Sequence, residues 1–505
     1  MSTPPNIILI ITDQQRWDTI GSLGAPWMKT PNLDRMAAEG TAFTDCFTTS
    51  PLCVSARASL FSGCYPHMLN VYHNFDSWEP TWVSSLAQAG YHCVNIGKMH
   101  INPYDAKGGF HQRFMVENKD RGLFLEEAPR AIYDEWDKAL LANNAVKPTR
   151  FTRHAADPEG FMKALGAFEW ELPERLFSDN FIADTSLWWL EQRKAKSPLF
   201  LQIGFCGPHP PYDPPRRYID MYKDVDLPLP EVTQAEIDAQ TPALKAYRRV
   251  QETGYFDSIA WRTQASREDL SRLRRHYAAN VTLLDERIGD IMASLERLGY
   301  LRDSLVIFTS DHGDNLGDHG LIGKHNMFEG SVRVPLIVRS PGRVPAGQVT
   351  DRLVSWMDIA PTILESAGVP VPKNWEAESL WSLLDDPEVP GRDAVYAELA
   401  RDHIQQEAEM MIMRRDRKWK VVFYLAQENG ELYDLEADPK EYQNLWHDSA
   451  HRAIRDDLVD KLLRWQVAGT LRSRIKERAR PQQPMAVQPA AELAPVNLNA
   501  GRAAG

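Results

Sequence analysis

Apolar runs of strand length alternate with longer stretches of helical periodicity along most of the chain. The strand-like runs are NIILIIT (6–12), YHCVNIG (91–97), LFLQIGF (199–205), SLVIFTS (304–310) and VPLIVRS (334–340). Between them, stretches such as NFIADTSLWWLEQR (180–193) and the long segment 269–299 repeat apolar residues every three or four positions. This alternation predicts an α/β fold in which a large, mostly parallel or mixed sheet is sandwiched by helices.

The rhythm changes after about residue 375. Short strands and turns follow, as in WKVVFYLAQENGELYDLEADP (419–439), and a helical pattern occupies about 450–475. We therefore predict a catalytic domain over 1–375 and a smaller C-terminal α+β subdomain, with an antiparallel sheet and a helix, over 376–478. The Ala/Pro/Gln-rich end, 479–505, is predicted to be a flexible tail or an arm that joins subunits of a homodimer or homotetramer. The segment 205–265, rich in proline and charge, is expected to run over the surface.

Charge and cysteine content narrow the classes of partner and compartment. The chain has 57 basic and 69 acidic residues, a net charge of −12, which disfavours nucleic acid or an anionic membrane as main partner. The apolar run at 6–12 is too short for a signal peptide or a membrane span. Five scattered cysteines argue against a disulfide framework and fit a cytoplasmic protein.

Polar side chains cluster where the predicted strands end. The first strand leads into Asp13 and Gln14, the second into GKMH (97–100), the third into GPHPPY (207–212) and the fourth into DHGD (311–314). The carboxyl ends of parallel strands meet at one edge of a sheet, where α/β proteins bind ligands. We therefore expect these side chains to share one site.

The chemistry of this edge predicts a metal site and an oxyanion site. Asp13, Asp311, His312 and the Gln14 amide suit a hard divalent cation, calcium first and magnesium or manganese next. Lysines and histidines around a cation neutralise a tetrahedral oxyanion, so the expected substrate is an ester of sulfate or phosphate. The other polar residues of the loop, Asp314, Asp318 and His319, are expected only to satisfy backbone groups of the turn.

A lone cysteine, Cys53, precedes a short predicted helix, ARASLFSG (56–63), that Gly63 closes. Its side chain would lie at the positive N-terminal end of that helix, where an activated nucleophile is stabilised. A thiolate is nevertheless a poor ligand for a hard cation, which prefers oxygen. Residue chemistry alone therefore predicts only an activated cysteine.

At this point the chain resembles the sulfatase family of the alkaline phosphatase superfamily. CVSARASLFSG (53–63) is similar to the sulfatase signature, Cys-x-Pro/Ala-x-Arg followed by Leu-x-x-Gly, and the resemblance extends over about 5–450 through KTPNLDRMAAEG (29–40) and the strand-end segments above. It implies an alkaline-phosphatase-like fold. It also implies that a maturation enzyme converts Cys53 to formylglycine, whose hydrated aldehyde supplies an oxygen ligand and nucleophile.

The resemblance also implies individual roles at matching positions. Asp13, Gln14, Asp311 and His312 resemble metal ligands, together with the modified Cys53. Arg57 resembles the residue that holds the hydrated aldehyde. The cradle for the transferred group and its leaving oxygen corresponds to Lys98, His209 and Lys324, and His100 resembles the base that breaks the covalent hemiacetal. Asn74 is either a pocket residue or an ordinary turn residue.

Two departures from the family pattern leave alternatives open. Ser55 stands where the signature has proline or alanine, which puts recognition by the maturation enzyme in question. Gln14 replaces a carboxylate, as in choline-sulfatase-like and phosphonate-monoester-hydrolase-like branches. The resemblance thus implies hydrolysis of small aryl or related sulfate esters, with a phosphonate monoester or phosphodiester hydrolase as the alternative. Lys98 and His100 favour the sulfatase, because the phosphonate branch has Tyr and Thr there. A relative that only binds oxyanions is a third, less favoured class.

Overall fold

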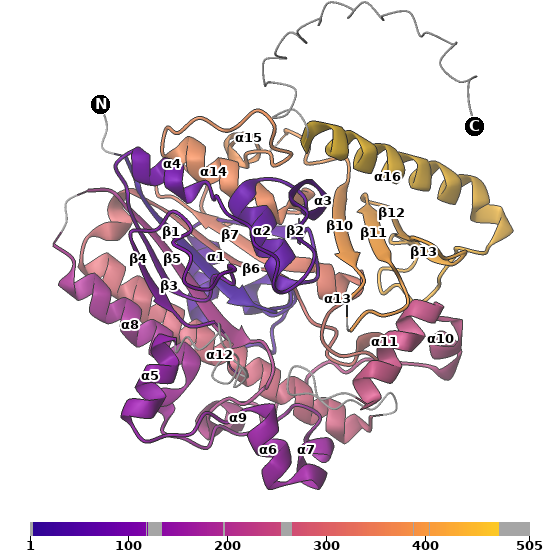
Figure 1. The fold of residues 1–505 in the computed structure, drawn as a ribbon, viewed down its shortest axis with the longest axis horizontal. Helices are drawn as coiled ribbons and strands as arrows, with labels where there is room; N and C mark the ends of the chain where they lie inside the picture. The colour runs from indigo at the N-terminus through magenta and orange to yellow at the C-terminus, as the bar shows by residue number, and fades with distance from the viewer. Residues whose placement is uncertain are drawn as a thin grey trace, which may run out of the picture.

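The fold consists of a large helix-covered sheet and a small antiparallel sheet beside it (Figure 1). The computed structural model describes residues 4–117, 119, 134–194, 197–253, 265–386, 388–402 and 404–473. The predicted tail at 479–505 lies outside these residues.

The large sheet has nine strands in the order β4-β3-β5-β1-β6-β7-β2-β8, and β9 also pairs with β2. The strands β3, β4, β5, β1 and β6 are parallel to one another, whereas β7 runs antiparallel to both β6 and β2. The sheet is therefore mixed, as predicted. Its strands are β1 (Asn6–Asp13), β2 (Thr41–Phe47), β3 (His92–Gly97), β4 (Gln112–Met115), β5 (Leu199–Pro208), β6 (Ser304–Ser310), β7 (Arg333–Arg339), β8 (Gln348–Thr350) and β9 (Val354–Ser355).

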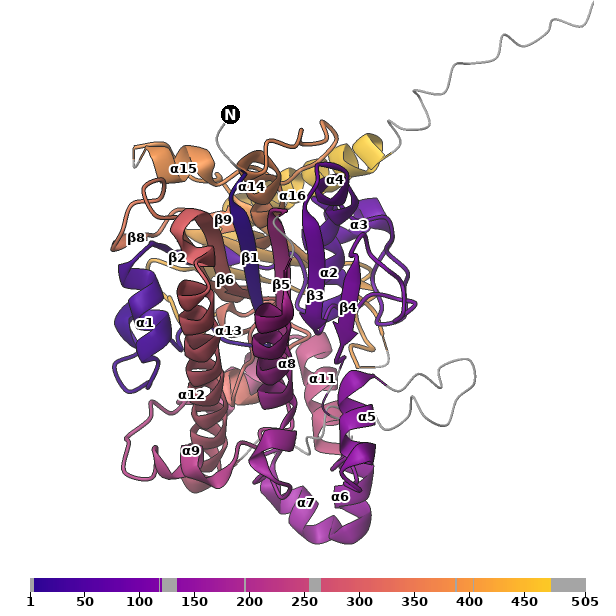
Figure 2. The ribbon, with the colours of Figure 1, turned by 90° about the vertical axis from the view of Figure 1, so that its left-hand side faces the viewer.

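Both faces of this sheet are buried, which explains why its central strands are continuously apolar. On β1, Ile8 and Ile10 pack into a core shared with the helices α8 (Ser178–Gln192) and α12 (Arg267–Arg297), which cross in front of the strands in Figure 2. The alternate residues Ile7 and Leu9 pack on the opposite side, against α2 (Cys53–Ser62) and α14 (Ile359–Ser366).

The remaining helices are shorter or lie in the peripheral and C-terminal parts of the chain. They are α1 (Pro31–Ala38), α3 (Pro66–Leu69), α4 (Val83–Gln88), α5 (Glu135–Ala142), α6 (Arg150–Ala156), α7 (Pro158–Ala164), α9 (Arg216–Asp220), α10 (Gln234–Ala239), α11 (Pro242–Thr253), α13 (Glu329–Val332), α15 (Trp381–Asp385) and α16 (Arg452–Ser473). Among the described residues, none of the helices has the length and apolar character that crossing a membrane requires.

The small sheet is built from β10 (Val395–Ala400), β11 (Met410–Arg415), β12 (Trp419–Tyr424) and β13 (Gly430–Asp434), all antiparallel. One face is covered by α16, which lies along the sheet in Figure 1 and packs Leu458 and Leu462 onto it. The other face packs on Leu52, just before α2, and on Met327, just before α13. The small sheet therefore supports the two segments that carry Cys53 and Lys324.

One expectation about organisation needs correction, and one strand of the large sheet lies outside the predicted runs. The described part of the segment 205–265 does not simply run over the surface, because Tyr212, Tyr218 and Tyr222 are fully buried in the main core; residues 254–264 of that segment lie outside the described residues. The strand β2 was not predicted, because the polar pair Thr44 and Asp45 interrupts its apolar pattern. The boundary near residue 375 stays a prediction. All five cysteines are free thiols, as expected.

Candidate active site

The predicted strand-end residues lie together at one edge of the large sheet. Asp13 is the last residue of β1, Asp311 directly follows β6, and Lys98 directly follows β3. His209 directly follows β5. All four strands run parallel, so their carboxyl ends bring these side chains to the same edge. Each of the four residues is buried.

The nucleophile candidate is the first residue of α2, and Gly63 ends the helix in the left-handed conformation, as predicted. The Lys324 ammonium lies 3.6 Å from the Cys53 sulfur. Burial alone would raise the pKa of the Cys53 thiol, but Lys324 and Lys98 outweigh burial and lower that pKa below its usual value. The surroundings of Cys53 therefore favour an anion.

Four side chains converge on a space that suits a cation. One ligand atom each from Asp13, Cys53, Asp311 and His312 lies within 4.8 Å of the other three. The His312 Nε2 atom lies 3.7 Å from an oxygen of Asp13 and 3.7 Å from one of Asp311. Neither Asp13 Oδ1 nor His312 Nε2 has a hydrogen-bond partner among the described residues, although both atoms are buried. A cation would satisfy both atoms, so the residues present fit a metal.

Basic side chains surround the two carboxylates. The Lys98 ammonium pairs with Asp13, and the Arg57 Nε donates to Asp311 Oδ2 at 2.8 Å. Burial alone would raise the pKa of Asp13, but Lys98, with His209, Lys324 and Arg57, holds it well below its usual value. A second nitrogen of Arg57, Nη1, donates to the Lys98 carbonyl at 2.9 Å. The cations therefore hold the carboxylates in their ionised form.

The backbone also fixes this edge tightly. Gly204 on β5 packs so close to the Lys98 carbonyl that a Cβ atom at 204 would lie 1.9 Å from its oxygen. Glycine is therefore required beside Lys98. Gln14 has a positive φ of 69°, and its backbone is held by a bond from its N–H to Asp311 Oδ1 at 3.1 Å and by the Tyr277 hydroxyl, which donates to its carbonyl at 2.7 Å.

Of the remaining predicted residues, some lie in the cluster, whereas Asn74 has no described contact with it. Lys324 lies in the loop after β6 and donates to Gln14 Oε1 at 2.8 Å, so both belong to the cluster. His100 is buried beyond β3, where its N–H donates to Glu117 Oε2 at 2.9 Å. Asn74 is half-buried, and no described contact joins it to the other candidate residues.

The sequence did not predict the side-chain contacts made by the loop residues Asp314, Asp318 and His319. Asp314, expected to serve only the turn, also binds the Gln14 side chain and the Tyr212 hydroxyl. The Asp318 side chain pairs with Arg16 at 2.7 Å and with Arg274, both outside the loop. The third residue of that expectation, His319, lies 2.7 Å from Glu236. These partners are distant in sequence, so the only sequence signal of a role for Asp314 at the site was its closeness to Asp311, three residues earlier.

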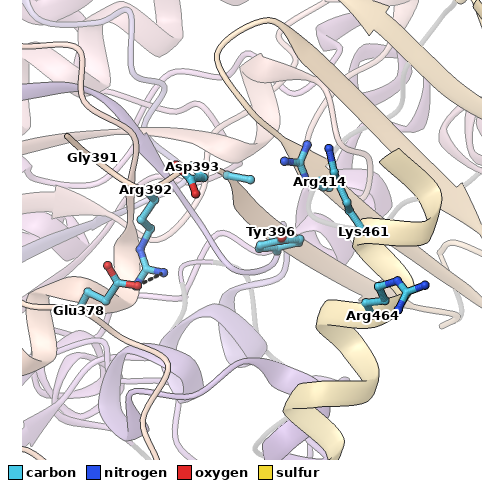
Figure 3. A pocket seen from close by; sticks show the side chains of 9 residues that line it. Glu378, Gly391, Arg392, Asp393, Tyr396, Arg414, Lys461 and Arg464 are labelled. Atoms are coloured by element: carbon cyan, nitrogen blue, oxygen red, sulfur yellow. Dashed lines mark ion pairs between the residues drawn. The ribbon is translucent and has the colours of Figure 1, made fainter. Parts of the chain in front are cut away.

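A separate pocket of about 790 Å³ opens between β10, β11 and α16 (Figure 3). Its lining is rich in basic side chains, yet each has a carboxylate partner. The pairs are Arg392–Asp358, Arg414–Asp416, Lys461–Asp457 and Arg464–Asp460. The basic side chains of this pocket are therefore already neutralised by neighbouring carboxylates.

A helix-covered sheet that gathers acidic ligands, a buried thiol and several cations at its strand ends is typical of hydrolases of oxyanion esters. Comparison with known proteins defines the family. Residues 5–369 match the family model Sulfatase, and residues 317–468 match the model N-sulphoglucosamine sulphohydrolase, C-terminal. The chain therefore belongs to the sulfatase family, and the expectation of an alkaline-phosphatase-like enzyme of the sulfuric ester hydrolase class is confirmed.

Individual relatives match over nearly the whole chain. An arylsulfatase of Clostridium perfringens is 30% identical over 479 residues, 92% of this chain and 95% of the relative. A choline-sulfatase of Rhizobium meliloti is 32% identical over 453 residues, 87% of this chain and 82% of the relative. The solved phosphonate monoester hydrolase of Agrobacterium radiobacter superposes with a TM-score of 0.74 at 26% identity, over 92% of this chain and 96% of that one.

Proposed function

We propose that the protein hydrolyses sulfate esters of small aryl or related alcohols, with residue 53 as nucleophile after conversion of Cys53 to formylglycine. The observation that carries this proposal is the position of Cys53: it begins α2 and shares one buried space with Asp13, Asp311 and His312. A divalent metal, calcium or otherwise manganese or magnesium, would be held by these residues and by Gln14. When bound, it would supply positive charge to the nucleophilic oxygen and to the ester.

The side chains around residue 53 have distinct proposed tasks. Lys324, next to the Cys53 sulfur, binds the ester oxyanion together with Lys98, so the charge that develops in the transition state meets preplaced donors. Arg57 presents Nη2, which is buried and has no partner among the described residues, to the group at position 53.

Proton transfer falls to the histidines. His209 lies close enough to Asp13 to lower its pKa, and we assign it, with Lys324, to the leaving oxygen. His100 accepts the proton that residue 53 must lose when the aldehyde is regenerated. Losing His209 should therefore hurt most for esters with poor leaving groups, whereas losing His100 should mainly slow turnover.

The second candidate is hydrolysis of phosphonate monoesters or phosphodiesters. It is favoured by the superposition on a phosphonate monoester hydrolase, and Gln14 in place of a carboxylate fits both candidates. Such esters have the same tetrahedral geometry and single charge, so the site should accept them as slower substrates.

The proposal is tested with protein coexpressed with a formylglycine-generating enzyme, the partner that maturation requires. Peptide mass spectrometry measures conversion at position 53 despite Ser55, and nitrophenyl sulfate hydrolysis measures activity. We expect activity in proportion to conversion and none in Cys53→Ala. An active preparation whose residue 53 is entirely thiol would contradict the proposal.

A further inference from the structure

The Gln14 side chain is held at both of its ends. Its Nε2 lies 2.5 Å from Asp314 Oδ2, and its Oε1 lies 2.8 Å from the Lys324 ammonium. A carboxylate can only accept hydrogen bonds, and an ammonium can only donate them. The two neighbours therefore allow a single orientation of the amide, with its oxygen toward Lys324 and the ligand cluster.

Asp314 is built into the loop so that it cannot turn away. Its Oδ1 accepts from the backbone N–H of Leu316 at 2.9 Å and of Gly323 at 2.8 Å, and its Oδ2 accepts from Tyr212 at 2.5 Å as well as from Gln14. The side chain is fully buried. With all four hydrogen bonds satisfied inside the protein, this carboxylate is not available as a ligand itself.

From these contacts we infer that Asp314 is a positioning residue, which fixes the Gln14 amide with its oxygen toward the cation site. The inference rests on the proposed function in one respect, namely that Gln14 acts as a ligand. It also explains how the chain can carry glutamine at position 14. The negative charge that a carboxylate would bring there is held by Asp314 instead, directly behind the amide.

The inference predicts that positions 14 and 314 depend on each other. In Gln14→Glu, a second buried carboxylate would face Asp314, and the two like charges would repel. In Asp314→Asn, the bonds from Leu316 and Gly323 keep the new amide oxygen in place, so its nitrogen would face the Gln14 nitrogen. The Gln14 amide would then turn its own nitrogen toward Lys324. In the double variant, the amide nitrogen introduced at position 314 donates to the carboxylate introduced at position 14, which removes both conflicts.

The test is a double-mutant cycle on the full chain with residue 53 as cysteine, by urea unfolding and by calorimetric titration of the metal-free protein with Mn²⁺. Each single variant should lower the urea midpoint and weaken Mn²⁺ binding at least about ten-fold, and the double variant should recover to within about three-fold. Asp318→Asn, in the same loop but paired with Arg16 and Arg274, is the matched control and should show no coupling to Gln14→Glu.

If the effects of the two substitutions simply add, the inference is wrong. If Asp314→Asn does not fold, Gln14→Glu is compared with Gln14→Met, which removes the amide without adding charge. Gln14→Glu must then be the less stable, and equal or greater stability would overturn the inference. Neither measurement uses substrate. An inactive protein with intact coupling would contradict the proposed function alone, and an active protein without coupling would contradict only this inference.

Discussion

Arg57, one turn into the helix that Cys53 begins, forms an ion pair with Asp311 at the end of β6, with 2.8 Å between Nε and Oδ2 and neither side chain exposed. The pair joins the nucleophile's helix to the edge of the sheet. Removing one partner of a fully buried pair leaves an uncompensated charge, so Arg57→Met should cost about 3–5 kcal/mol of unfolding free energy.

Urea unfolding measures this cost. The control is Arg401→Met, which breaks a pair of similar length with Glu409 in which both side chains are more than half exposed. It should cost less than about 1 kcal/mol. If both variants lose the same free energy of unfolding, burial does not make the Arg57–Asp311 pair more stabilising than an exposed pair.

Metal binding should appear as a gain in thermal stability. A ligand that binds only the folded chain raises its midpoint, so added calcium or manganese should raise the Tm of the metal-free protein in a concentration-dependent way. In Asp311→Asn this shift should vanish whatever the starting Tm, whereas Asp318→Asn should keep it. A metal-dependent shift that survives in Asp311→Asn would place the metal elsewhere.

A buried lysine of the small sheet holds the segment that follows Lys324. Lys420 on β12 is fully buried and lies 2.7 Å from Glu329 and 2.6 Å from Glu441, and it donates to the Met327 carbonyl at 3.0 Å. Lys420→Met leaves two buried carboxylates facing each other, and should cost about 3–5 kcal/mol and lower kcat/KM because the loop shifts.

The matched control is Lys418→Met on the neighbouring turn. Lys418 is nearly half exposed and pairs with Glu436, so its loss should leave both the urea midpoint and kcat/KM nearly unchanged. If Lys420→Met is as stable as the control, the small sheet does not support the loop as we argue.

Glu431 predicts a pH dependence of stability. Burial raises the pKa of Glu431 to about 7, against the opposing hydrogen bond from Tyr424 at 2.5 Å, and Glu441, Lys420 and His319 also act on it. The folded chain keeps a proton that the unfolded chain releases above about pH 4.5. The contribution of this proton to the free energy of unfolding is therefore complete below that pH. It is lost as pH rises through about 7, by about 3 kcal/mol in total.

Glu431→Gln removes this proton exchange. Compared with the unsubstituted protein, the variant should gain stability at about pH 8 and differ little at about pH 5. Urea unfolding at both values measures the difference, with the exposed Glu428→Gln as control. If the free energy of unfolding depends on pH in the same way in the unsubstituted protein and in Glu431→Gln, Glu431 is not the group responsible.

Much of the site could be predicted because strand ends place it. Asp13, Lys98, His209 and Asp311 follow apolar runs that are parallel neighbours, so local pattern was enough to bring them together. Cys53 was recognised from its place before a short helix. Formylglycine, Lys324 and the individual roles came only from the resemblance, because a thiol before a helix has many other uses.

The supporting contacts could not be predicted, since their partners are separated by long stretches of chain. Asp314 binds Gln14, 300 positions earlier, and Tyr212, 102 positions earlier. In the sequence, DHGDNLGDHG is an ordinary turn-rich loop. Likewise, β2 was hidden because two polar residues break its apolar pattern, although β7 and β8 flank it in the sheet.

Sulfate ester hydrolysis by a matured residue 53 is tested most directly by one comparison of kcat/KM. Matured protein is assayed in parallel on nitrophenyl sulfate, a nitrophenyl phosphonate monoester and a phosphodiester with the same leaving group. We predict the highest kcat/KM for the sulfate, with measurable but lower values for the phosphorus esters. A clearly higher kcat/KM for the phosphonate or the diester would contradict the account, and would assign the site to phosphorus ester hydrolysis.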